Sequence, residues 1–204
     1  MTELESHYRK ADDTILIEIK LSSVMQVFDS MDPAPFYEKA IDTNAEEYIT
    51  GAVMDFPLQV PQKLVIYVPE GDMRTEEAQQ LGDAIHNHFA YRSMVASRAL
   101  KHKLLRGRIS LVIALLFLAT CLSVRYALAA SFEDDVLTGM LREGLLIIGW
   151  VAMWEPVNIF LYGWWPLVRE RRVFDKAKTM EVVVVPYVAV PAEWSAVPDL
   201  SSGD

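Results

Sequence analysis

The sequence has a single cysteine and none of the short motifs that mark the common enzyme classes. Cys121 lies within an apolar run and cannot form an intramolecular disulfide, so cysteine usage does not indicate the redox compartment. A glycine-rich phosphate loop, a Gly-x-Ser-x-Gly nucleophile motif and a Cys-x-x-Cys pair are all missing. An enzyme is therefore the least supported class, and we expect no catalytic residues and no cofactor.

The sequence also contains no recognisable metal-binding motif. His86 and His88 are two residues apart on a predicted helix, so their side chains point to different faces and do not form a ligand pair. We expect them to be ordinary surface histidines. The aspartates of the N-terminal part follow no calcium-loop pattern, and no bound metal is expected.

Positive charge is scarce: the formal net charge is -9, with 19 Lys and Arg against 28 Asp and Glu. The acidic residues are concentrated in the N-terminal part, which could not neutralise phosphates, so nucleic acid is not expected as a partner. The chain opens on polar residues that include Glu3 and Glu5, the opposite of a basic secretory signal.

What the sequence does have is two long apolar runs. The first covers residues 109–130 and carries one charge, Arg125; the second covers residues 145–167 and carries one charge, Glu155. Each run is close to the roughly 20 residues that a helix needs to cross the hydrocarbon core of a bilayer. The two runs predict a hairpin of two transmembrane helices.

Basic residues flank this hairpin on both sides, whereas the loop inside it is acidic. Because basic flanks stay in the cytoplasm, we expect both termini to be cytoplasmic and the loop external. The basic residues before the first run are Arg92, Arg98, Lys101, Lys103, Arg106 and Arg108, and those after the second are Arg169, Arg171, Arg172, Lys176 and Lys178.

Three segments outside the hairpin have the β-branched composition of strands: residues 14–21, 63–68 and 181–190. Pro186 predicts that the third lies at an edge of the sheet, because proline has no amide to donate. The simplest assembly pairs it with the two N-terminal strands.

Two helices are predicted alongside these strands. One is capped by Thr43 or Asn44 and ends near Met54. The other starts after Thr75 and continues into the first apolar run.

The expected fold class is an α+β membrane protein, in which a two-helix transmembrane hairpin carries a small cytoplasmic α/β domain built from both termini. The lipid bilayer is one partner; others are copies of the chain, other membrane helices or a cytoplasmic protein. The expected boundaries are 1–91 for the N-terminal part of the domain, 92–108 for a basic membrane-proximal helix, 109–130 and 145–167 for the transmembrane helices, 131–144 for the external loop, 168–190 for the basic helix end and returning strand, and 191–204 for a loosely ordered tail.

A polar stripe is predicted within the second apolar run. Glu155 lies near its middle, where an ionised carboxylate facing lipid would be costly, and Asn158 and Tyr162 share its helix face. Pro156 removes a backbone donor and is expected to kink the helix. The stripe serves either as an ion or proton path or as an interhelical contact that holds an oligomer together. Both interpretations require neighbouring helices.

Arg125 is the candidate partner of Glu155 across the hairpin. Counted from the outer ends of the two apolar runs, the residues are offset by roughly 8 Å along the helix axis. The alternative is that Arg125 extends towards the outer headgroups. Gly139, Gly144 and Gly149 would permit close helix approach, although their spacing of five is not that of a GxxxG motif.

Three segments carry a resemblance: 28–36, reading FDSMDPAPF; 149–156, reading GWVAMWEP; and 162–166, reading YGWWP. Together they resemble a family of small bacterial two-span inner-membrane proteins with no assigned function. The resemblance implies a location in the inner membrane and no particular activity.

Two functions follow from these features. The first is a non-enzymatic, oligomeric inner-membrane protein whose cytoplasmic domain mediates assembly or partner binding. The second is a subunit of an ion or proton channel or transporter that uses the stripe around Glu155.

Overall fold

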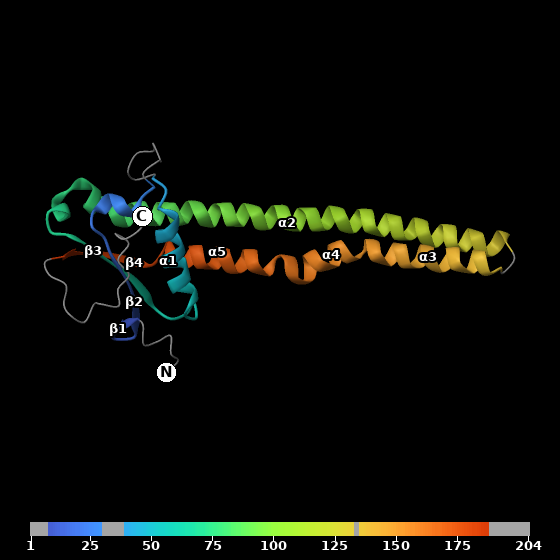
Figure 1. The fold of residues 1–204 in the computed structure, drawn as a ribbon, viewed down its shortest axis with the longest axis horizontal. Helices are drawn as coiled ribbons and strands as arrows, with labels where there is room; N and C mark the ends of the chain where they lie inside the picture. Colours follow the sequence, from blue (N-terminus) through green and yellow to red (C-terminus); the bar gives the residue numbers. More distant parts are fainter. Residues whose placement is uncertain (1–7, 30–38, 133–134, 188–204) are drawn as a thin grey trace. The chain divides into compact units, whose positions relative to one another are not determined.

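The computed structural model describes residues 8–29, 39–132 and 135–187, and the predicted tail 191–204 lies outside them. The fold is mixed α/β, with a small sheet and two long apolar helical segments (Figure 1). The chain forms two compact units. Unit 1 comprises Met1–Val95 and Glu170–Asp204, and therefore combines both ends of the sequence; unit 2 comprises Ala96–Arg169.

The sheet of unit 1 has four strands in the order β1-β2-β3-β4. The three predicted strands are present and parallel to one another, and β4 lies at the end of the order, where Pro186 can be accommodated. A fourth strand, β1, pairs antiparallel with β2 and was not predicted, because three residues are too few to show an alternating pattern. The strands are β1 (Arg9–Ala11), β2 (Thr14–Lys20), β3 (Gln62–Pro69) and β4 (Glu181–Tyr187).

The helices of unit 1 begin at defined caps. Helix α1 (Thr43–Met54) is capped by Asp42, whose side chain accepts a hydrogen bond from the amide of Asn44 at 2.9 Å, so the predicted cap was one or two residues late. Helix α2 (Glu76–Ser131) follows Thr75, whose hydroxyl accepts from the amide of Ala78 as predicted. Short 3₁₀ turns, η2 (Val24–Val27) and η4 (Asp72–Arg74), connect the elements.

One face of the sheet is covered by helices. The parallel connections β2-α1-β3 and β3-α2-α5-β4 advance in the same direction, so right-handed crossovers place their helices on one face. Gly82 of α2 accordingly lies against Val182 of β4. Phe89 and Phe174 stack in this layer with ring centroids 6.2 Å apart. The fully buried strand side chains beneath it are Ile15, Ile17, Ile19, Leu64, Ile66 and Val68.

Unit 2 contains the later part of α2 and a second, interrupted helical segment that runs antiparallel beside it (Figure 1). Helix α3 starts at Val136, inside the segment expected to be a loop, because the side chain of Asp135 accepts a hydrogen bond from the amide of Val136 at 2.8 Å. The elements of this segment are α3 (Val136–Ala152), α4 (Trp154–Asn158), the π-helical turn η5 (Ile159–Gly163) and α5 (Trp165–Ala177), the last of which continues into unit 1.

Small residues at intervals of seven form the contact between the two segments of unit 2. Gly107, Ala114 and Cys121 line α2, and Gly149 and Pro156 line the facing segment; all five are buried. This spacing is that of a coiled-coil seam, and it brings the backbones close together.

The two seam glycines, Gly107 and Gly149, differ from Gly139 and Gly144 in the space around them. A Cβ on Gly107 would lie 2.7 Å from Cγ2 of Ile159, and one on Gly149 would lie 2.8 Å from Cδ1 of Leu118. Gly139 and Gly144, which the sequence also suggested as contact points, have nothing within 4 Å of that position.

Both helical segments are long and apolar enough to cross a membrane. Their most apolar 18-residue windows have mean hydropathies of 2.2 and 1.6, and only 11% and 17% of these windows are buried. A core helix of a water-soluble protein would have most of such a window covered.

The seam predicts different effects for two glycine-to-alanine changes. Gly107→Ala places a methyl against the stiff, β-branched Ile159, and we expect it to destabilise the hairpin by about 1–3 kcal/mol. Gly144→Ala fills open space, and we expect a neutral effect or a gain of about 0.5–1 kcal/mol. Helix unfolding in detergent with increasing SDS, followed by circular dichroism, measures both. Equal changes in stability for the two variants would contradict the close contact at the seam.

Candidate functional site

The predicted polar stripe lies on the second helical segment of unit 2. Glu155 and Asn158 belong to α4 and Tyr162 to η5, and all three are exposed. Pro156 is buried at the seam. Helix α3 ends at Ala152, four residues before Pro156, where the proline ring would clash with the carbonyl of a continuous helix.

Glu155 pairs with Arg106 and not with the candidate partner Arg125. The Arg106 guanidinium lies 3.7 Å from the Glu155 carboxylate. Because residue 107 faces 159 and residue 118 faces 149, Glu155 is level with about residue 112 of α2. Arg125 lies roughly 20 Å further along this helix. The early start of α3 explains the error, since counting from residue 145 placed Glu155 too near the loop.

This register moves the stripe to the basic end of the hairpin. Asn158 is level with Arg108, and Tyr162 is level with Leu104, the residue after Lys103. The polar side chains therefore lie beside the cations that precede the first apolar run, and the long apolar stretch of the hairpin lies between them and the loop.

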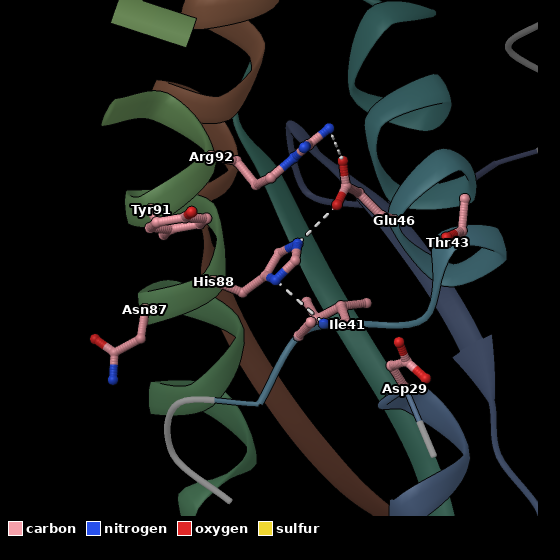
Figure 2. Close-up of a pocket in the computed structure, with 9 residues that line it drawn as sticks. Asp29, Ile41, Thr43, Glu46, Asn87, His88, Tyr91 and Arg92 are labelled. Atoms are coloured by element: carbon pink, nitrogen blue, oxygen red, sulfur yellow. Dashed lines mark hydrogen bonds and ion pairs between the residues drawn. The ribbon is translucent and has the colours of Figure 1, made fainter. Parts of the chain in front are cut away.

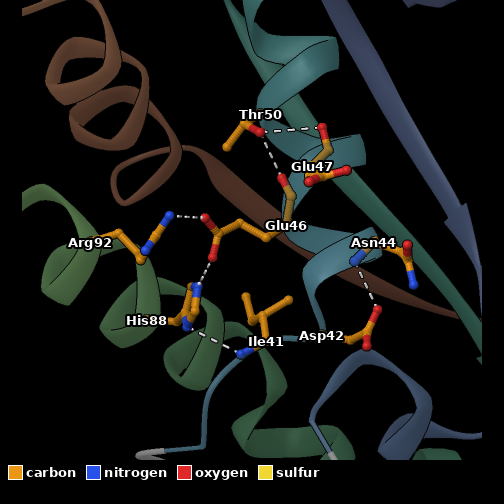
Figure 3. A network of polar contacts seen from close by, with 8 residues as sticks. All are labelled: Ile41, Asp42, Asn44, Glu46, Glu47, Thr50, His88 and Arg92. Atoms are coloured by element: carbon orange, nitrogen blue, oxygen red, sulfur yellow. Dashed lines mark hydrogen bonds and ion pairs between the residues drawn. The ribbon is translucent and has the colours of Figure 1, made fainter. Parts of the chain in front are cut away.

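A second polar cluster, the Glu46 cluster, lies in unit 1 and consists of Glu46, His88, Arg92 and the amide of Ile41 (Figures 2 and 3). Glu46 extends from α1 towards two side chains that are one turn apart on α2. Its Oε2 lies 2.7 Å from Nε2 of His88, and its Oε1 lies 2.7 Å from the Arg92 guanidinium. The cluster thereby ties α1 to α2.

Both ring nitrogens of His88 are engaged in this cluster. The amide of Ile41 donates to Nδ1 at 3.1 Å, so Nδ1 carries no proton and Nε2 donates to Glu46. A histidine in this position cannot accept a proton from a substrate unless it gives up one of the two bonds. The Glu46 cluster is therefore a structural clamp and not a poised acid–base pair.

Charge and aromatic contacts stabilise the clamp. Burial alone raises the pKa of Glu46, but the hydrogen bond from His88 and the charge of Arg92 outweigh it, and the pKa of this carboxyl lies below its ordinary value of 4.5. Arg92 also lies over the ring of Phe174, 5.1 Å from its centroid. One arginine thus joins α1, α2 and α5.

A cavity of about 570 Å³ lies beside the clamp (Figure 2). It is half-open and mixed in polarity, and the clamp occupies part of its wall. Its lining comprises Asp29, Ala40, Ile41, Thr43, Glu46, Asn87, His88, Tyr91 and Arg92.

Sequence reasoning missed the clamp. The expectation of a surface histidine is wrong for His88, whose side chain is 7% exposed, and His86 lies 2.8 Å from the carbonyl of Met180 through Nε2. The spacing of His88 and Arg92, four residues apart on one helix face, was the signal that could have suggested a shared anionic partner. Among the described residues, no group of three or more His, Cys, Asp or Glu side chains could hold a metal.

The sheet face opposite the helices forms a third feature, a shallow groove of about 500 Å³ that we call the sheet groove. Apolar Leu16, Val65, Val183 and Val185 form its floor. Ion pairs flank it: Arg9 with Glu18 at 3.2 Å, and Lys63 with Glu181 at 2.7 Å.

A buried tyrosine completes the polar side of the sheet groove. The Tyr67 hydroxyl donates to Glu18 at 2.7 Å. Burial, with this hydrogen bond and the negative charge of Glu18, raises the pKa of Tyr67 above its ordinary value of 10.0. Tyr67 therefore stays neutral and donates its proton throughout the physiological pH range.

The Glu46 cluster predicts an acid dependence of stability. Because the pKa of Glu46 is lower in the folded state, its contribution is fully present above pH 4.5 and is lost as the pH falls through the folded value. We expect Glu46→Gln to lose about 2 kcal/mol at pH 7. Between pH 5 and pH 3, the free energy of unfolding of the variant should also fall less steeply with decreasing pH than that of the unchanged protein.

Thermal unfolding of the detergent-solubilised protein across this pH range measures the effect. Glu47→Gln, on the exposed side of α1, is the matched control and should behave like the unchanged protein. If the unfolding temperature of all three proteins depended on pH in the same way, the stabilising role of the Glu46 cluster would be contradicted.

Comparison of the chain with protein-family models, with curated proteins and with solved structures finds no match. The resemblance to small bacterial two-span proteins stays a prediction.

Proposed function

We propose that the chain is a non-enzymatic protein of the bacterial inner membrane, anchored by the hairpin of unit 2. Unit 1 lies in the cytoplasm in this proposal, as do both termini. Its role is to hold copies of the chain together or to bind a partner protein. The sheet groove is the observation that carries the binding role.

The exposed apolar surface of the hairpin supports the anchor. Trp154 is 76% exposed, and Leu116 and Val151 are each 66% exposed, at positions well inside the apolar runs. A contiguous apolar surface of this extent on a water-soluble monomer would cause aggregation. In a membrane, lipid or other helices would cover this apolar surface, and it would not cause aggregation.

The sheet groove supports the binding role. Parallel strands usually have both faces of their sheet covered by other parts of a protein. In the described part of the chain, helices cover only one face; on the other, the half-buried Leu16, Val183 and Val185 and the buried Val65 lie between two ion pairs. A second protein surface with an apolar ridge would complete the layer.

The clamp supports a non-enzymatic function. The described histidine closest to a catalytic arrangement, His88, has both nitrogens engaged within the protein. Glu46 has both carboxylate oxygens engaged as well.

The register of the hairpin favours the anchor over a channel. A conducting path needs polar groups through the apolar depth of the bilayer. Glu155, Asn158 and Tyr162 are instead gathered towards the basic end of the hairpin, which in this proposal lies near the headgroups.

Topology reporters test the anchor. A periplasmic reporter inserted after Phe132 should be active, and fluorescent protein fused to either terminus should fluoresce. The protein should remain in the membrane after alkaline carbonate washing and be released by detergent. A cytoplasmic location of the Phe132 reporter would reverse the proposed orientation.

Charge substitution tests the sheet groove. Val183→Lys places a charge on its floor, and we expect it to lower the assembled fraction about tenfold, because an unpaired charge would be buried at the interface. Met25→Lys, an equal change at an exposed position of η2, is the matched control. Light scattering in detergent gives the mass of each species. Identical masses for both variants and the unchanged protein would exclude the groove as the assembly surface.

A further inference from the structure

The basic end of the hairpin in unit 2 contains a lysine that reaches across the seam. Lys103 is half-buried, and its Cε lies 3.2 Å from the position of a Cβ on Gly163. Its Nζ lies 3.9 Å from the same point. The ammonium is therefore held over the π-helical turn η5, in space that exists because residue 163 has no side chain.

Arg106 provides a second cation one turn away. Its contact with Glu155 is 3.7 Å, longer than a hydrogen bond, and its side chain is 74% exposed. A guanidinium has five donors in a fork that matches two phosphate oxygens. Arg106 can bind a phosphate without losing a strong bond inside the protein.

The two cations converge on one side of α2, whereas their neighbours do not. Lys103 and Arg106 are three residues apart on one face of α2, and each contacts the facing segment, Lys103 at Gly163 and Arg106 at Glu155. Lys101 and Arg108, seven residues apart, share the opposite face and are exposed. The arrangement is therefore more specific than a uniformly basic membrane flank.

Aromatic side chains surround the same end of the hairpin. Tyr162 and Trp165 pack edge to face with centroids 6.3 Å apart and are 62% and 58% exposed. The indole of Trp164 donates to the carbonyl of Phe160 at 2.9 Å, within the turn η5. Tryptophan and tyrosine are favoured at the headgroup level of a bilayer. The cations and the rings together match a lipid with a charged head and an apolar tail.

We propose that Lys103 and Arg106 bind the phosphate of an anionic phospholipid at the turn η5. This inference rests on the proposed membrane anchor. Lys103 and Arg106 outnumber the one carboxylate that contacts either of them, Glu155, so a headgroup with net negative charge is favoured over a zwitterionic one, whose ammonium Lys103 would repel. The exposed rings of Tyr162 and Trp165 favour a lipid over free phosphate, which has no apolar part.

Native mass spectrometry of the full chain in detergent, titrated with phosphatidylglycerol, tests the site. The Lys103→Gln/Arg106→Gln double variant should bind roughly thirtyfold more weakly. The Lys101→Gln/Arg108→Gln double variant removes the same charge from the opposite face and should change affinity less than twofold. Equal losses in the two double variants would overturn the site and would mean that the lipid is attracted by diffuse charge.

Glu155→Gln should change the affinity for phosphatidylglycerol in the opposite direction. It frees Arg106 from its carboxylate and should strengthen phosphatidylglycerol binding severalfold, whereas a merely structural role of the pair would weaken or not affect binding. Phosphatidylcholine should bind poorly to every protein. Displacement of the lipid by millimolar inorganic phosphate would assign the site to free phosphate and overturn the lipid.

Membrane retention separates the two proposals. If the protein stays in the membrane after alkaline carbonate but the two double variants bind the lipid equally, the proposed anchor stands and the proposed lipid site is wrong. Release by carbonate would overturn both.

Discussion

The contact of Gly107 with Ile159 sets the register of the hairpin, and most of the chemistry of unit 2 depends on it. Since a Cβ on Gly107 would lie 2.7 Å from Ile159, the helices can approach this closely only where a glycine stands. The second contact, between Gly149 and Leu118, prevents the segments from sliding. Once these two contacts are fixed, Lys103 lies over η5 and the long side chain of Arg106 is within reach of Glu155. A change of register by one turn would separate both pairs.

Unit 1 depends on a different constraint, the parallel pairing of β4 with β3. Its strands come from both ends of the sequence, so the sheet is complete only when the chain has returned through unit 2. The Glu46 cluster adds a polar tie between α1 and α2, and Arg92 extends it to α5 through the ring of Phe174. Helices contributed by distant segments are thereby held on one face of the sheet, which leaves the sheet groove on the other.

The sequence predicted the elements well where local composition decides them. The β-branched runs gave β2, β3 and β4, Thr75 marked the start of α2, and Pro186 indicated an edge. Prediction from the sequence was wrong where single contacts determine the start of a helix or the environment of a side chain. Hydropathy placed the second apolar run from residue 145, but the cap at Asp135 starts α3 at Val136. His88 was misjudged for a related reason, because its partners Ile41 and Glu46 are more than 40 residues away and no local pattern contains them.

The shift of Glu155 changes what its environment can do. At the middle of a bilayer, a carboxylate would have to be protonated or paired, and either state suggests transport or tight interhelical bonding. Level with residue 112, near the basic end of the first apolar run, its exposed carboxylate lies 3.7 Å from the Arg106 guanidinium. Its effect is then to moderate the positive charge at η5, so that Arg106 is positioned but not neutralised. In the proposed membrane anchor, one loosely paired arginine, one lysine over a glycine and exposed aromatic rings would suit headgroup recognition without a cavity, because a bilayer would supply the remaining walls.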